Sequence, residues 1–247
     1  MEGAHKENIF REAFNKVDGV RRKKAECMRF EKSQAACLGA GLLLQLAVQA
    51  ALQETEKEEK VRISTELVGD MPAQEDMPSQ KRGAAFELAV YTASQVLEQL
   101  NELLDLKMYY GGNGKPYLEN YPFYFNLSHS GNYVVCAISP REVGVDIQEY
   151  RQVDMERLAK RFFSKEEQNA LKVCTKGKEQ YELFYQLWTR KEAYGKLTGE
   201  GIAAVIDKST LLKEGTFTVA EAEANPQLFW QEWKLDGYAI ALCQYGI

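Results

Sequence analysis

The stretch REVGVDIQEY, residues 141–150, decides how this chain is interpreted. Its apolar centre predicts a buried β-strand that ends in an acid, a spacer and an amide. Asp146 and Gln148 are two positions apart, so on an extended chain their side chains point to the same side. A single Asp at a strand end is most often a turn former. Here it places a carboxylate next to an amide oxygen at the end of a strand that is otherwise apolar.

Helix and strand patterns alternate along the chain, which predicts the α+β class. Strands are expected over 124–139, with a turn at 130–132, over 142–147, and over 229–246 as a hairpin across Asp236 and Gly237. Helices are expected over 7–17, 33–53 with Ser33 as N-cap, 84–106, two short stretches within 154–174, and 178–198. Ser164 and Glu167 have capping-box spacing, and Gly199 ends the last helix. Residues 54–83 are charged and contain Pro, so they are expected to form a solvated helix extension and a loop.

Composition argues against several classes of protein. The chain has 247 residues and a net charge of -5, so bulk electrostatics give no support to a nucleic-acid partner. Its 5 cysteines form no CxxC pair, which argues against a zinc cluster or a disulfide framework and fits a reducing cytosol. The first residues lack the apolar segment of a signal peptide, and the apolar stretch 40–52 is shorter than the roughly 20 residues that span a membrane. The expectation is a cytoplasmic protein with no membrane partner.

A second acidic position lies on the last predicted helix. Glu192 is four residues before Lys196, so the two share one stripe of the helix, and a surface ion pair is the ordinary explanation of this spacing. Asp146, Gln148 and Glu192 together would offer two carboxylates and an amide oxygen, the hard donors that Mg²⁺ prefers. Because Mg²⁺ is usually held by one or two carboxylates plus substrate phosphates, the set indicates a phosphate-bearing substrate.

Three further segments have phosphate-binding chemistry but also ordinary explanations. GGNGKPY, residues 111–117, carries Lys115 without the spacing of a Walker loop or of GxGxxG, so a plain turn is favoured. Ser128 and His129 are adjacent but belong to no GxSxG elbow, and a hydrogen-bonded turn histidine is favoured over a phosphate contact. The basic run 21–24 is usually a solvated face, but it could also meet phosphate.

The order and spacing of these segments resemble those of the 4'-phosphopantetheinyl transferases of the large, surfactin-synthetase-activating type. The segments are GKPYL, FNLSHSGNYVVCAIS, GVDIQ, RFFSKEEQNAL and FYQLWTRKEAYGKLTGEG, between residues 114 and 201. The specific pair is GVDI followed by WTRKEAYGK. The resemblance implies a fold of two similar α/β halves related by a pseudo-twofold. The N-terminal half would cover 1–140, with a long helical and loop insertion over about 54–113, and the C-terminal half, 141–247, would carry the metal site.

The resemblance implies an enzyme that moves the phosphopantetheine arm of coenzyme A onto a serine of an acyl or peptidyl carrier protein and releases 3',5'-ADP. Asp146 and Glu192 match its Mg²⁺ ligands. Gln148 stands where this group commonly has Glu, so a third contact would be weaker, water-mediated or absent. The serine proton would go to Glu192, to Glu167 or to a metal-bound water. Lys196 matches a lysine that stabilises or protonates the leaving phosphate.

Contacts with coenzyme A are implied at further positions. The expected contacts are Gly114, Lys115 and Pro116 at the adenine pocket with Lys115 reaching phosphate, Ser128 and His129 at the phosphates, Lys191 beside the pyrophosphate, and Lys23 near the 3'-phosphate. An arginine common in the N-terminal helix of the family is replaced by Cys37, for which Lys32 or His129 would compensate.

The implied partners are coenzyme A and an apo carrier protein, and the expected state is a monomer. Carrier proteins are usually acidic at their docking helix, so the local basic cluster formed by Arg157, Lys160, Arg161 and Lys165 is the candidate docking surface. Two other functions stay open: a coenzyme A-binding module that lost activity through the changes at Gln148 and Cys37, and an α+β interaction domain without a coenzyme A site. The complete acid and lysine set in WTRKEAYGK favours the transferase.

Overall fold

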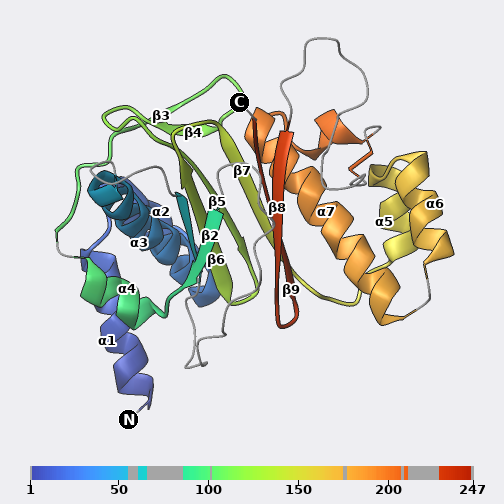
Figure 1. Ribbon diagram of the computed structural model, residues 1–247. Helices are drawn as coiled ribbons and strands as arrows, with labels where there is room; N and C mark the ends of the chain where they lie inside the picture. Colours follow the sequence, from blue (N-terminus) through green and yellow to red (C-terminus); the bar gives the residue numbers. More distant parts are fainter. Residues whose placement is uncertain are drawn as a thin grey trace. The chain divides into compact units, whose positions relative to one another are not determined.

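The computed structural model describes residues 2–54, 61–65, 86–100, 102–174, 177–206, 209–210 and 228–245 (Figure 1). The chain divides into two compact units. Unit 1 comprises Met1–Tyr109 and Tyr117–Pro140, and unit 2 comprises Tyr110–Pro116 and Arg141–Ile247. Most of unit 2 follows Pro140, and the short segment Tyr110–Pro116 also belongs to unit 2.

Unit 1 combines helices with a mixed sheet. Its elements are α1 (Glu2–Asn15), α2 (Gly19–Glu26), α3 (Glu31–Glu54), β1 (Val61–Thr65), β2 (Phe86–Val90), α4 (Ala93–Gln99), β5 (Tyr124–Ser130) and β6 (Tyr133–Ser139). In the described part of the chain the sheet has the order β2-β1-β6-β5, with β1 and β2 parallel and the other neighbours antiparallel. The predicted strand, turn and strand over 124–139 are confirmed. The short strands β3 (Met108–Tyr110) and β4 (Pro116–Leu118) pair with each other.

The segment that follows α3 differs from the sequence expectation. The helix predicted over 84–106 is wrong, because its first part is strand β2, which pairs in parallel with β1. Only Ala93–Gln99 is helical, and Thr92 caps it in a capping box with Gln95. Strand β1 lies within the predicted loop 54–83, most of which is outside the described residues. The supposed insertion therefore contributes two strands to the sheet of unit 1.

Helix α3 is the core helix of unit 1 and packs on β6 and β1. It begins at Glu31, so Ser33 lies inside its first turn and is not the predicted N-cap. By length and composition alone α3 could cross a membrane, since an 18-residue window has a mean hydropathy of 1.8, but 67% of that window is buried in the protein. The core helix of a globular unit meets the same criterion.

Unit 2 contains the strand predicted within residues 141–150 and the long helix predicted over 178–198. Its elements are β7 (Val143–Glu149), α5 (Met155–Phe162), α6 (Lys165–Val173), α7 (Lys178–Thr198), the 3-10 helix η1 (Ile202–Val205), β8 (Leu228–Leu235) and β9 (Tyr238–Tyr245). The described sheet has the antiparallel order β7-β9-β8, and α7 packs on β7 and β9 (Figure 1).

Local signals in unit 2 are confirmed where the chain was expected to turn or stop. Ser164 and Glu167 form the predicted capping box at the start of α6. Gly199 follows α7 with a φ of 76°, and Gly237 turns the β8–β9 hairpin with a φ of 74°. These conformations favour glycine because a Cβ atom would clash with the backbone.

Candidate active site

Strand β7 and helix α7 approach each other closely at Gly144. A Cβ atom at this position would lie 2.0 Å from the carbonyl oxygen of Ala193 and 2.6 Å from the amide nitrogen of Leu197. A glycine inside a strand often marks such a close approach of two backbones. Asp146 lies two residues further along β7 and therefore on the same side of the strand as Gly144. The missing side chain of Gly144 thus allows α7 to lie next to Asp146.

Asp146 is a buried carboxylate, 2% exposed, whose two oxygens both accept hydrogen bonds. Lys196 Nζ donates to Oδ1 at 2.6 Å and also to the carbonyl oxygen of Val145 at 3.2 Å. Gln148 Nε2 donates to Oδ2 at 3.0 Å. The structure therefore brings together the strand-end pair and the lysine of the long helix.

Glu192 completes this cluster from α7, one turn before Lys196. Burial raises the pKa of the Glu192 carboxyl, the negative charge of Asp146 raises it further, and the positive charge of Lys196 lowers it. The carboxylates of Asp146 and Glu192 therefore repel each other, and the ammonium of Lys196 offsets part of this repulsion. The residues Asp146, Gln148, Glu192 and Lys196 are called the acidic cluster below.

The acidic cluster fits a hard divalent cation. Among the described residues no three His, Cys, Asp or Glu side chains form a metal-binding group, so the protein alone offers two carboxylates and the amide of Gln148. Mg²⁺ commonly takes one or two carboxylates and completes its shell with water and substrate phosphates. A cation would also relieve the repulsion that raises the pKa of Glu192. The ligand set predicted from the sequence stays a prediction that this donor chemistry favours.

The structure places Glu167 and Lys191 differently from the roles expected for them. Both side chains are 0% exposed, and Lys191 Nζ lies 3.0 Å from Glu167 Oε2. Glu167 also accepts hydrogen bonds from the backbone amides of Ser164 and Thr210. A base must be reached by the serine it deprotonates, and a pyrophosphate contact must be reached by the nucleotide. Burial is therefore at odds with Glu167 as the base and with Lys191 as a pyrophosphate contact.

The side chain of Lys115 is likewise buried within unit 2. It is 7% exposed, and its ammonium pairs with Glu142 and donates to the carbonyl oxygen of Leu197 at 2.7 Å. Gly114 precedes it with a φ of 78°, and Pro116 begins β4. These contacts fasten the segment Tyr110–Pro116 to the end of α7, which disagrees with the expectation that Lys115 reaches phosphate.

The remaining candidate residues belong to unit 1. Ser128 and His129 follow each other on β5, with Ser128 buried and His129 exposed, as expected for neighbours on a strand. Lys23 is exposed in the last turn of α2. Cys37 is buried on α3, and its carbonyl oxygen accepts a hydrogen bond of 3.2 Å from Nη1 of Arg21. In the sequence Arg21 is part of the basic run 21–24, and no local pattern predicts its hydrogen bond to Cys37.

Three further residues with structural contacts near the site were not predicted from the sequence. Gly144 sets the approach of α7, Glu142 neutralises Lys115, and Thr210 holds Glu167. Of these, only Gly144 had a signal, since a glycine within an apolar strand indicates close packing. The partners of Lys115 and Glu167 lie 27 and 43 residues away in the chain, so local patterns do not connect them.

We expect Glu192→Gln to stabilise the metal-free protein at neutral pH. Because the folded state raises the pKa of Glu192, the contribution of this group to stability is present at low pH and is lost as the pH rises through the folded pKa. Unfolding by urea at a series of pH values should therefore show a gain for Glu192→Gln at pH 7 that shrinks toward acid.

Glu182→Gln is the matched control for this measurement. The pKa of Glu182 is lowered, mainly by its hydrogen bond and charge interaction with Lys234, so its contribution has the opposite sign. Glu182→Gln should lose stability at pH 7 or leave it unchanged. A loss of stability in Glu192→Gln at pH 7 would show that Glu192 is not held in an unfavourable charged state.

Comparison with known proteins gives one consistent family. Residues 142–243 match the family model described as the 4'-phosphopantetheinyl transferase superfamily. The chain is 40% identical over 137 residues to the 4'-phosphopantetheinyl transferase psf-1 of Bacillus pumilus, which covers 53% of this chain and 58% of that protein. It is 34% identical over 134 residues to the 4'-phosphopantetheinyl transferase Sfp of Bacillus subtilis (strain 168), covering 53% and 59%.

A third relative extends the match slightly. The 4'-phosphopantetheinyl transferase ffp of Bacillus subtilis is 34% identical over 149 residues, covering 59% of this chain and 65% of that protein. The chain thus matches less than two thirds of the length of each of these three relatives. The family model includes β7, α7 and the whole acidic cluster.

Proposed function

Because residues 142–243 belong to the 4'-phosphopantetheinyl transferase superfamily, we propose that the protein transfers the 4'-phosphopantetheine group of coenzyme A to a serine of an acyl or peptidyl carrier protein. The transfer requires Mg²⁺ and releases 3',5'-ADP. The observation that carries this proposal is the acidic cluster, in which Asp146, Glu192 and Lys196 meet between β7 and α7. The same three residues were selected from the motif GVDI and the motif WTRKEAYGK.

The reaction is a phosphoryl-type transfer. The serine oxygen forms a bond to the β-phosphorus of coenzyme A, the pyrophosphate bond breaks, and the electron pair leaves with the α-phosphate of 3',5'-ADP. Such transfers depend mainly on positioning and on neutralising charge. Mg²⁺, held by Asp146 and Glu192 with Gln148 as a neutral third donor, would supply charge neutralisation at the pyrophosphate.

The chain itself supplies the proton acceptor and a second cation. Glu192 is the acceptor of the serine proton in this proposal, because it belongs to the acidic cluster, whereas Glu167 is fully buried. A carboxylate has two oxygens, so contact with a metal ion and acceptance of a proton are compatible. Lys196, held by Asp146, is the ammonium that stabilises the leaving phosphate.

Gln148 should weaken metal affinity relative to a glutamate at this position. We expect Gln148→Glu to bind Mg²⁺ about tenfold more tightly, or about 1.4 kcal/mol, because it adds an anion to the cluster. Without metal the same variant should be less stable, because the new carboxylate would face Asp146 instead of donating a hydrogen bond to it. Titration calorimetry with Mg²⁺ measures the first effect and urea unfolding the second.

Gln152→Glu is the control for added charge, since Gln152 is exposed and lies outside the acidic cluster. It should leave Mg²⁺ affinity within about twofold, because exposed charges are screened by solvent and salt. Equal Mg²⁺ affinity in Gln148→Glu and in the natural protein would contradict the assignment of Gln148 to the metal site.

The carrier protein is proposed to dock on the basic cluster of α5 and the start of α6. Arg157, Lys160, Arg161 and Lys165 are all exposed there, and Arg161 lies over the ring of Phe162 at 4.9 Å. A positive patch on a protein of net charge -5 favours an acidic partner surface at that place. A monomeric state, a cytoplasmic location and a pseudo-twofold relation of the two halves also belong to this proposal.

Transfer rates to a panel of apo carrier proteins test the proposed function. The panel contains carriers from fatty-acid, polyketide and peptide synthases, and each is assayed with coenzyme A and Mg²⁺. Transfer to at least one carrier supports the proposal and names the carrier class. Tight coenzyme A binding without transfer to any carrier would favour an inactive binding module, and absence of both would favour an interaction domain.

A further inference from the structure

A buried ion pair next to the acidic cluster has no role in the proposed transfer. Lys191 Nζ lies 3.0 Å from Glu167 Oε2, and both side chains are fully buried. The ammonium also donates to the carbonyl oxygen of Val205 at 2.7 Å and lies 5.9 Å from the centroid of the Phe163 ring. A charge is buried without loss of stability only where its hydrogen-bonding groups have partners, and the pair meets this condition through the chain that follows α7.

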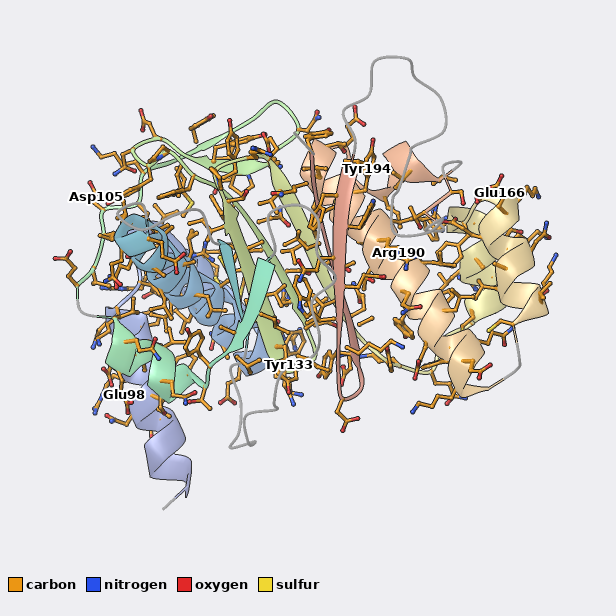
Figure 2. All side chains as sticks on the ribbon, viewed as in Figure 1. Glu98, Asp105, Tyr133, Glu166, Arg190 and Tyr194 are labelled. Carbon is orange, nitrogen blue, oxygen red and sulfur yellow. The ribbon has the colours of Figure 1, made fainter. Side chains whose placement is uncertain are left out.

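Glu167 connects the pair to a second point of that chain. Its Oε1 accepts hydrogen bonds from the backbone amide of Thr210 at 2.6 Å and from the hydroxyl of Thr210 at 2.7 Å. The carbonyl oxygen of Thr210 in turn accepts a hydrogen bond of 3.0 Å from Nη1 of Arg190. Arg190, labelled on α7 in Figure 2, also makes two hydrogen bonds of 2.9 and 2.6 Å to Glu232 of β8.

The chain reverses direction directly after α7 and is fastened to it at a third point. The amide of Gly201 donates to the carbonyl oxygen of Gly195 at 3.0 Å. A Cβ atom on Gly195 would lie 2.5 Å from the carbonyl carbon of Gly201, so the two backbones are in close contact. Gly195 is next to Lys196 and three residues after Glu192. The contacts at Gly201, Val205 and Thr210 therefore support the part of α7 that carries the site.

We infer that Lys191, Glu167 and Thr210 form a positioning clamp that fixes the chain after α7 onto the helix and thereby holds Glu192 and Lys196 against Asp146. The inference rests on the proposed transferase function. It gives Lys191 and Glu167 a role that requires no contact with coenzyme A or with the carrier serine. Lys191 thus acts through the neighbouring Glu192, although both belong to one sequence motif.

A double-mutant cycle separates the clamp from direct contact with substrate. Lys191→Met leaves the Glu167 carboxylate buried without its cationic partner, and Glu167→Gln leaves the ammonium without its anionic partner. Removing both charges together relieves this conflict. For a clamp, each single variant should lower kcat by about tenfold or more with KM for coenzyme A changed by less than about twofold, because binding contacts are kept. The double variant should be more active than Lys191→Met alone.

The opposite pattern would overturn the clamp. If Lys191 contacted the pyrophosphate and Glu167 took the serine proton, Lys191→Met would raise KM for coenzyme A, and the double variant would be less active than either single variant.

A substitution at Thr210 tests the clamp without removing a buried charge, so it also serves if the charged variants fail to fold. Thr210→Val removes one hydrogen bond to Glu167 and keeps the backbone amide, whereas Thr210→Ser keeps both. Hydrogen exchange at residues 202–206 and 210 should accelerate in Thr210→Val and stay unchanged in Thr210→Ser. Unchanged exchange in Thr210→Val would overturn the clamp.

The exchange measurement uses the full chain without substrates. A protein that transfers nothing to any carrier would refute the proposed function, while the exchange rates would still decide the clamp.

Discussion

Asp146→Asn is expected to lower kcat/KM for transfer to a carrier protein by about a thousandfold, the loss typical of removing one strong electrostatic contact from an active site. The change keeps the shape of the side chain but removes the negative charge that Lys196 contacts at 2.6 Å. It also takes one of the two carboxylates from the cation site. Steady-state kinetics with excess Mg²⁺ measures the loss, and circular dichroism shows whether the fold is kept.

Asp154→Asn is the matched control. Asp154 is an exposed N-cap of α5, and asparagine caps a helix about as well as aspartate. The control should keep both its stability and its kcat/KM. A fall in kcat/KM of less than about tenfold in Asp146→Asn, with the fold intact, would contradict the role of Asp146 as the central acid of the site.

Gly144→Ala should be strongly disruptive to unit 2. The added Cβ would lie 2.0 Å from the carbonyl oxygen of Ala193 and 2.6 Å from the amide of Leu197, and neither backbone group can rotate away. Overpacking a buried contact costs about 1–3 kcal/mol, and a clash with backbone lies at or above the upper end. This clash is relieved when α7 moves away from β7, and that movement separates Glu192 and Lys196 from Asp146. Transfer activity should therefore fall by about a hundredfold even in the fraction that folds.

Gly112→Ala is the control for a glycine-to-alanine change in the same unit. Nothing lies within 4 Å of a Cβ built at Gly112, so this variant should be neutral in urea unfolding and in activity. A Gly144→Ala protein with natural stability and natural activity would show that β7 and α7 do not need the close approach seen in the structure.

The sequence predicted most of unit 2 because its signals are local. A capping box at Ser164, turn residues at Asp236 and Gly237, and a glycine stop after α7 each depend on neighbours within a few residues. The acidic cluster could be selected because its members lie in two short motifs. The helix predicted over 84–106 was wrong because strand β2 is specified by parallel pairing with β1, a long-range interaction that overrides helix propensity.

The roles of buried charges could not be predicted for a related reason. Nothing in the sequence distinguishes Lys115, Glu167 and Lys191 from exposed charges, and only the structure shows their burial and their partners. Lys115 forms an ion pair with Glu142 and a hydrogen bond to the end of α7. Glu167 forms an ion pair with Lys191 and accepts a hydrogen bond from Thr210. Charged side chains are rarely buried without such partners, so the burial of these positions is at odds with the most frequent expectation, which is solvent or substrate contact.

The most direct test of the central claim is the intact mass of an apo carrier protein after incubation with this protein, coenzyme A and Mg²⁺. The carrier should gain the mass of one phosphopantetheine group. The gain should be absent when the acceptor serine is replaced by alanine, when Mg²⁺ is chelated, and when Asp146→Asn replaces the natural protein. Unchanged carrier mass for members of all three synthase classes, with the protein folded and coenzyme A bound, would contradict the account.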